Sequence, residues 1–61
     1  MLWRISFAKI HRGDVKMRAK IDIEAPTKSV ALARAITEMG LGWEVWPYKD
    51  QETATEMLSA A

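Results

Sequence analysis

Residues 15–24 read VKMRAKIDIE, and this stretch decides the fold because apolar and charged residues alternate along its whole length. In an extended chain, successive side chains point to opposite faces. One face holds Val15, Met17, Ala19, Ile21 and Ile23, and the other holds Lys16, Arg18, Lys20, Asp22 and Glu24. The alternation predicts a β-strand with one buried face and one solvated face.

A weaker alternation over Leu2–Ile10 precedes this strand, with Trp3, Ile5 and Phe7 on one face. The segment His11–Asp14 lies between the two alternating stretches and contains Gly13, which favours a turn. Two alternating stretches separated by a turn signal predict a β-hairpin.

The register of the hairpin follows from keeping apolar residues on one face. A register with Phe7 opposite Ala19 does this, and it also sets Arg4 opposite Asp22, a favourable charge pair. A three-residue loop over residues 12–14 gives that register and is our preferred prediction. The alternative is a tighter turn combined with a β-bulge near Ala8 and Lys9, which would bring Ile10 and Lys9 into phase.

A helix is predicted to follow the hairpin over Lys28–Met39. Pro26 ends the strand because proline cannot donate to the sheet, and Thr27 is a good N-cap. Gly40 is suited to the left-handed residue that ends a helix, with Leu41 folding back on Ile36. The predicted apolar stripe consists of Leu32, Ala35, Ile36 and Met39, and the opposite side carries Val30, Arg34 and Thr37.

Two further elements are predicted after the helix. Residues 42–46 read GWEVW and predict a third strand, which Pro47 ends. Asp50 can cap a short last helix, whose apolar residues at helical spacing are Ala54, Met57, Leu58 and Ala61.

The predicted fold is a single α+β domain over residues 1–61, of the type ββαβ with a short C-terminal helix. A right-handed crossover makes the third strand parallel to the second, and the strand order is 2-1-3. The first helix covers one face of this three-stranded sheet. The predicted core consists of Trp3, Ile5, Phe7, Val15, Met17, Ile21, Ile23, Trp43 and Val45.

Length and composition limit the functional classes. The 61 residues contain no cysteine, which excludes disulfides and thiolate sites, and no apolar run reaches the length of a membrane span. We expect a cytoplasmic protein without membrane contact, because the N-terminus lacks a signal peptide. The net charge of +1 hides a partition, since residues 1–20 carry six basic groups and one acidic group, and residues 21–61 carry three and seven.

Enzymatic activity is not predicted. His11 is the sole histidine and adjoins the hairpin turn, which favours a solvated side chain over a catalytic base. Asp22 and Glu24 share one face, but Arg4 and Lys20 nearby favour a ladder of solvated charges. No histidine or cysteine cluster is present, so neither a metal nor a cofactor is expected.

The leading functional prediction is a non-enzymatic binding or regulatory module that acts through protein–protein contacts. Apolar residues exceed those that the first helix can cover, and aromatic residues and methionine are favoured at interfaces. The candidate interface residues are Trp46, Tyr48, Met57 and Leu58. The partner is another protein or a second copy, since so short a chain gains core by dimerising. Alternatively, the last helix folds over Trp46 within one molecule.

A second prediction is a module that binds single-stranded nucleic acid. Cations for phosphate and a ring for base stacking would lie together on the open face of the sheet. The candidate residues are Arg4, Lys16, Arg18, Lys20 and Trp46. The net charge of +1 is low for this class of protein.

The stretch from Ile21 to Ala35, IDIEAPTKSVALARA, resembles an element of many small proteins of bacteria and their phages. In those proteins a strand ends in a short cap, an alanine-rich helix starts at once, and a later strand carries a tryptophan, here Trp43. The resemblance covers about residues 15–46. It implies a small accessory or host-directed phage protein that acts by binding, and it assigns no functional residue.

Overall fold

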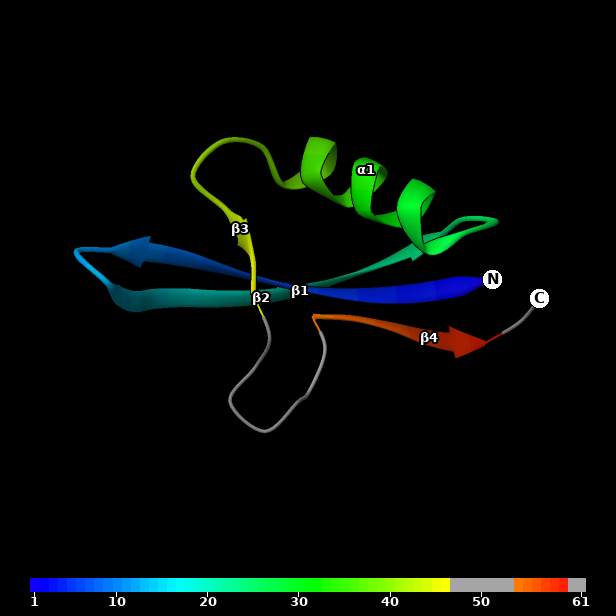
Figure 1. Ribbon diagram of the computed structural model, residues 1–61, viewed down its shortest axis with the longest axis horizontal. Helices are drawn as coiled ribbons and strands as arrows, with labels where there is room; N and C mark the ends of the chain where they lie inside the picture. The colour runs from blue at the N-terminus through cyan, green and yellow to red at the C-terminus, as the bar shows by residue number, and fades with distance from the viewer. Residues whose placement is uncertain (47–53, 60–61) are drawn as a thin grey trace.

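The computed structural model describes residues 1–46 and 54–59. The elements in chain order are β1 (Leu2–His11), β2 (Asp14–Glu24), α1 (Lys28–Met39), β3 (Glu44–Val45) and β4 (Thr55–Ser59). The strands form one sheet in the order β2-β1-β3, and β4 also pairs with β1. Helix α1 lies over one face of this sheet (Figure 1). The predicted α+β class, the strand order and the position of the helix are confirmed.

The register of the hairpin is also confirmed. Phe7 lies opposite Ala19 and Arg4 lies opposite Asp22. β3 pairs antiparallel with β1, as β2 does, so β3 runs parallel to β2 as predicted. Alternation of apolar residues was therefore sufficient to align the two long strands.

The predicted three-residue loop of the hairpin is wrong. His11 pairs directly with Asp14, so the turn consists of Arg12 and Gly13. Their φ angles are 52° and 80°, and two positive φ angles are typical of a type I′ turn, whose twist matches that of a hairpin.

A β-bulge corrects the register that this tighter turn would otherwise impose. Lys9 pairs with Met17 but Ile10 pairs with Val15, which leaves Lys16 as the extra residue of β2. The bulge thus lies close to the place that the alternative prediction gave it.

Helix α1 has the predicted bounds and caps. The Thr27 side chain accepts a hydrogen bond from the Val30 backbone N–H at 3.3 Å. At the other end Gly40 has a φ of 80°, and its N–H donates to the Ile36 carbonyl at 3.1 Å. These contacts satisfy backbone groups that the helix itself leaves without partners.

The buried face of α1 is rotated from the predicted stripe. Ala31 and Ala35 are fully buried and Val30 packs against the core, whereas Ile36 is 53% exposed. Leu41 is completely exposed, so its predicted contact with Ile36 is wrong. Two small alanines let the helix backbone approach the sheet closely, and this contact outweighs burial of the larger Ile36.

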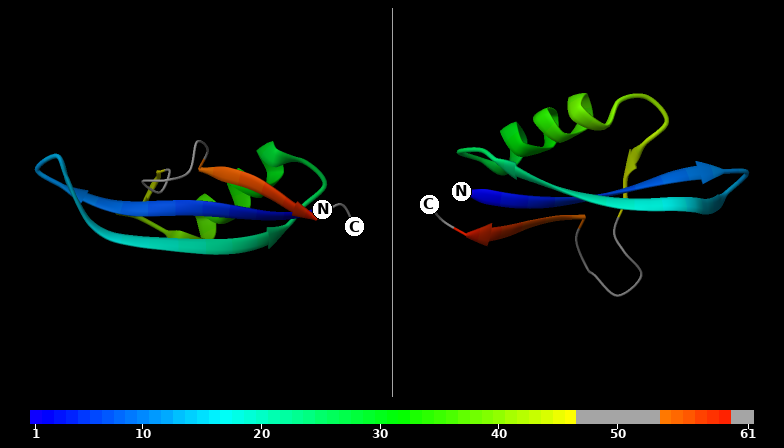
Figure 2. Two further views of the ribbon diagram at one scale, coloured as in Figure 1. Left: turned by 90° about the horizontal axis from the view of Figure 1, so that it is seen from below. Right: turned by 180° about the vertical axis from the view of Figure 1, so that it is seen from behind.

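The core lies between α1 and β1. Its buried residues are Ile5, Phe7, Ala25, Ala31 and Ala35. The half-buried residues packed against them are Trp3, Ile21, Ile23, Val30, Leu32, Met39, Trp43 and Val45. Val15 and Met17, which were predicted to be core residues, are not among them, and Met17 is 55% exposed. The hairpin projects beyond α1, so the helix does not cover this end of the strands (Figures 1 and 2).

The C-terminal part differs most from the prediction. The short helix is wrong for residues 55–59, which form β4 and pair antiparallel with the first half of β1. Asp50 and Ala61, the predicted cap and last apolar residue of that helix, lie outside the described residues. The third strand is shorter than predicted, since β3 spans Glu44–Val45. On the side of β1 away from β2, β3 pairs only with Phe7 and Ala8, and β4 pairs with the first half of the strand.

Candidate functional site

Strand β2 forms one edge of the sheet. It pairs with β1 along its whole length, and no other strand of the described part of the chain pairs with it. With 11 residues it is also the longest element among the strands. A long edge strand is a template for pairing with a further strand, so this edge is the first candidate for a binding site.

The backbone direction along this edge follows from Ser6 in β1. The Ser6 N–H donates to the Ala54 carbonyl at 2.8 Å, and its carbonyl accepts from the Trp46 N–H at 2.9 Å. Both groups point away from β2, so Ser6 and its partner Lys20 form a non-hydrogen-bonded pair. The N–H and carbonyl of Lys20, and those of Asp22 two residues later, are therefore directed to the outer edge.

Arg34 confirms this direction at the end of the strand. Its Nη1 donates to the Glu24 carbonyl at 2.8 Å. Glu24 lies two residues beyond Asp22, so its carbonyl points to the same outer edge. The bond ties α1 to β2 and occupies the last outward carbonyl of the edge.

An open groove of about 560 Å³ runs between this edge and α1. It is lined by Asp22, Ile23, Glu24, Ala33, Arg34, Thr37 and Glu38. Asp22 and Glu24 direct their carboxylates to the face away from α1, where Arg4 and the N-terminal amine bind them, so the charges on the α1 side of the groove are those of Glu38 and Arg34, which are opposite in sign. A groove next to an edge strand can accept the side chains of a strand that pairs there.

On the face away from α1, Arg4 lies between two carboxylates on neighbouring strands. Its Nε and Nη2 donate to the two Asp22 carboxylate oxygens at 2.9 and 3.2 Å, and Glu56 of β4 pairs with it on the other side. The hydrogen bond and the charge of Asp22 raise the pKa of Arg4, with a smaller contribution from Glu56. The hydrogen bond from Arg4 in turn lowers the pKa of Asp22.

Three of the predicted nucleic-acid residues share the open face with at least as many acidic side chains. Arg4 is bound to Asp22, and Arg18 and Lys20 also have polar interactions within the chain. The register places Arg4, Arg18 and Lys20 on this face together with Asp22, Glu24, Glu44 and Glu56, whereas Lys16 is the extra residue of the bulge. These described residues give the face no excess of positive charge.

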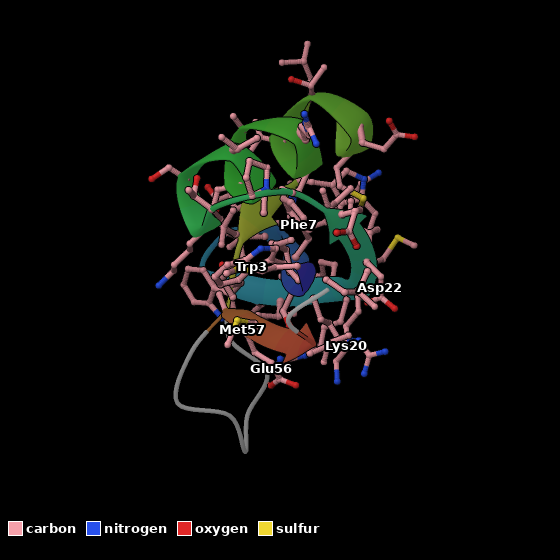
Figure 3. The ribbon with its side chains drawn as sticks, turned by 90° about the vertical axis from the view of Figure 1, so that its right-hand side faces the viewer. Trp3, Phe7, Lys20, Asp22, Glu56 and Met57 are labelled. Atoms are coloured by element: carbon pink, nitrogen blue, oxygen red, sulfur yellow. The ribbon has the colours of Figure 1, made fainter. Side chains whose placement is uncertain are left out.

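The predicted protein-interface residues do not form one surface. Trp46 is 41% exposed and follows Val45, which packs on the core, so alternation places Trp46 on the open face. Met57 is 53% exposed but lies opposite Trp3, on the face that carries α1. Figure 3 shows Met57 near Trp3, and Glu56 on the other side of the sheet. Leu58 is half-buried, and Tyr48 lies outside the described residues.

The sequence analysis missed the contribution of α1 to the groove. Arg34, Thr37 and Glu38 follow the i, i+3, i+4 spacing of one helix face. That spacing could have indicated a common surface. Its position beside β2 could not be predicted without knowing that Ala31 and Ala35 form the buried face.

Comparison with protein-family models, with curated proteins and with solved structures finds no match to this chain. Within the described residues, no helix is long and apolar enough to cross a membrane. Residues 1–46 and 54–59 contain no group of three or more histidine, aspartate or glutamate side chains that could hold a metal ion.

Proposed function

We propose that the chain is a non-enzymatic binding module that recognises a protein partner by pairing the outer edge of β2 with a strand of that partner. The observation that carries this proposal is the 11-residue edge strand with an open groove beside it. In such pairing, backbone hydrogen bonds supply affinity and the adjacent groove selects side chains.

The lining of the groove indicates the kind of strand that fits. Ile23 and Ala33 supply its apolar surface, and the charges of Glu38 and Arg34 on the α1 side are opposite in sign. The carboxylates of Asp22 and Glu24 lie on the other face, bound by Arg4 and the N-terminal amine. A partner strand with apolar side chains facing the groove would therefore be favoured over a strongly charged one.

The state of Asp22 supports binding over acid–base chemistry. Arg4 lowers the pKa of this carboxyl, so it is ionised at neutral pH and holds no proton to donate. A general acid or base working near neutral pH needs a pKa shifted toward that pH. Asp22 is suited to fixed charge contacts.

The test is a selection of displayed ten-residue peptides against the chain, followed by binding to two variants. Lys20→Pro removes an outward N–H without removing a bond to β1, whereas Lys20→Ala keeps that N–H and removes the charge. Selected peptides should lose most of their affinity for Lys20→Pro and retain most of it for Lys20→Ala. Equal binding of every selected peptide to Lys20→Pro and to the unmodified chain would overturn the proposal.

The projecting hairpin favours nucleic acid as a second candidate function. Its outer part, residues 9–18, carries Lys9, Arg12, Lys16 and Arg18 against Asp14 alone. Single-stranded oligonucleotides should then quench the fluorescence of Trp46, with binding that weakens steeply as salt is added. Absence of quenching at low salt would remove this candidate.

A further inference from the structure

The charged face of β2 is divided into two blocks of opposite sign. Arg18 and Lys20 come first, after the bulge residue Lys16, and Asp22 and Glu24 follow. Two copies of such a strand that run antiparallel place the basic block of each beside the acidic block of the other. Opposite charges directly across an antiparallel pair stabilise it, and like charges destabilise it.

We propose that the strand recognised by the β2 edge is β2 of a second copy of this chain, paired antiparallel about a two-fold axis at Ile21. This inference rests on the proposed function, because it names the partner of the same edge. In this register Lys20 faces Asp22 of the second copy and Arg18 faces Glu24 of the second copy. Symmetry repeats both pairs on the other side of the axis.

Competing registers are less favourable. An axis at Lys20, the next register that the backbone allows, sets Lys20 against Lys20 of the second copy. A parallel arrangement in register brings the basic block of one copy beside the basic block of the other, so that like charges lie side by side. With the axis at Ile21, Lys20 of each copy faces Asp22 of the other, and no like charges lie opposite each other. Because the interface is two-fold symmetric, the assembly is limited to a dimer.

The backbone is compatible with this register. Lys20 and Asp22 both direct their N–H and carbonyl groups outward, so the two residues can form a hydrogen-bonded pair across the axis. Arg34 holds the Glu24 carbonyl and so limits the strongest part of the ladder to the centre of β2.

The pairing also extends the charge pattern already present on the open face. Glu56, Arg4 and Asp22 form a row of alternating sign across β4, β1 and β2. Lys20 of the second copy would continue that row with a further positive charge. Arg18 and Lys20 have polar interactions within their own chain. The proposed pairing therefore depends on the sign of the charge at each position, and it does not require that these side chains lack partners in the monomer.

On the other face, the same pairing joins apolar surface. Ile21 and Ile23 are half-buried under α1, and the two-fold axis brings Ile21 against its own copy. Because the axis is perpendicular to the sheet, both α1 helices lie on the same side of the combined sheet. The groove lined by Ile23 and Ala33 then faces the corresponding groove of the second copy.

Sedimentation equilibrium over micromolar to millimolar concentrations tests the proposal. The unmodified chain should show a monomer–dimer equilibrium. Arg18→Glu replaces two attractive pairs with two repulsive ones and should weaken the dimer at least about tenfold. The double variant Arg18→Glu, Glu24→Arg exchanges the two charges and should restore it. Circular dichroism of each variant establishes that the monomer is folded.

Lys16→Glu is the matched control. It makes the same charge change on the same strand, but an axis at Ile21 places Lys16 opposite Pro26, so the dimer should change less than about threefold. An axis at Lys20 instead places Lys16 opposite Glu24, and a large loss in this variant would overturn the proposed register.

A chain that is monomeric over the whole concentration range would overturn the dimer, as would a dimer that Arg18→Glu leaves unchanged. These outcomes are separable from failure of the proposed function. Selected peptides that bind the unmodified chain but not Lys20→Pro would retain β2 as a binding edge even if the chain is monomeric.

Discussion

β1 has neighbours on both sides, and the two sides differ in continuity. On one side, β2 follows it from Leu2 to His11 and is joined to it by a two-residue turn. On the other side, β3 and β4 cover it in two pieces that meet at Ser6. The comparison teaches that neighbouring residues in sequence specify the first side, whereas distant segments must be brought together to complete the second.

The largest expected effect comes from Phe7, on which both sides depend. Phe7 is 1% exposed and lies opposite Ala19 of β2 and Val45 of β3. Phe7→Ala should lower the free energy of unfolding by about 3–5 kcal/mol, as other large-to-small core substitutions do. Denaturant unfolding followed by circular dichroism measures this. Met17→Ala, on the same face but 55% exposed, should change the free energy of unfolding far less.

A pair of proline substitutions distinguishes the inner from the outer edge of β2. The Ile21 N–H points toward β1, so Ile21→Pro should cost about 3 kcal/mol or more of stability. The Lys20 N–H points outward, so Lys20→Pro should cost much less. Thermal unfolding of the two variants tests the assignment, and equal destabilisation would contradict it.

The bond from Arg34 to the Glu24 carbonyl tests what closes the end of the β2 edge. Arg34→Met keeps most of the aliphatic side chain and removes the donor, so it should cost about 1 kcal/mol of stability. Glu38→Gln, in the same groove, serves as a control and should remain within about 0.5 kcal/mol of the unmodified chain. Unfolding in urea resolves the difference, and identical midpoints would show that the bond contributes nothing.

The smallest effect concerns Arg4 and Asp22, which link β1 to β2. The pKa of Asp22 is lowered by Arg4 in the folded state, so the pair stabilises the fold above the ordinary pKa of aspartate, about 3.9. This stabilisation is lost as the pH falls through the lowered pKa, because the carboxyl then becomes neutral. The melting temperature of the unmodified chain should therefore fall more steeply below about pH 4 than that of Asp22→Asn. Parallel curves would contradict this.

The side of the sheet formed by β2 was predictable because its signals are local. Alternation fixed the strand, and the Arg4–Asp22 pair agreed with it. The prediction of the turn was wrong because Arg12 takes a positive φ, which is uncommon for a residue other than glycine. The bulge at Lys16 compensates, and only the spacing of Lys9 and Ile10 indicated it.

The other side was not predictable from local signals. Alanine, glutamate, methionine and leucine in residues 54–58 favour a helix in isolation. Pairing with the exposed half of β1 outweighs that preference, because unpaired backbone groups beside Ile5 would be costly. For the candidate site, the charge blocks of β2 are visible in the sequence. The groove with Arg34 depends on how α1 is rotated on the sheet.

Ser6 has a consequence for how the chain can change over evolution. Its N–H and its carbonyl bind Ala54 and Trp46, so both ends of residues 47–53 are held at one position of β1. β3 and β4 run in the same direction along that strand and pair with its two halves. The bonds of Trp46 and Ala54 to Ser6 set the register on either side, so the sequence between them can change while both strands stay paired with β1.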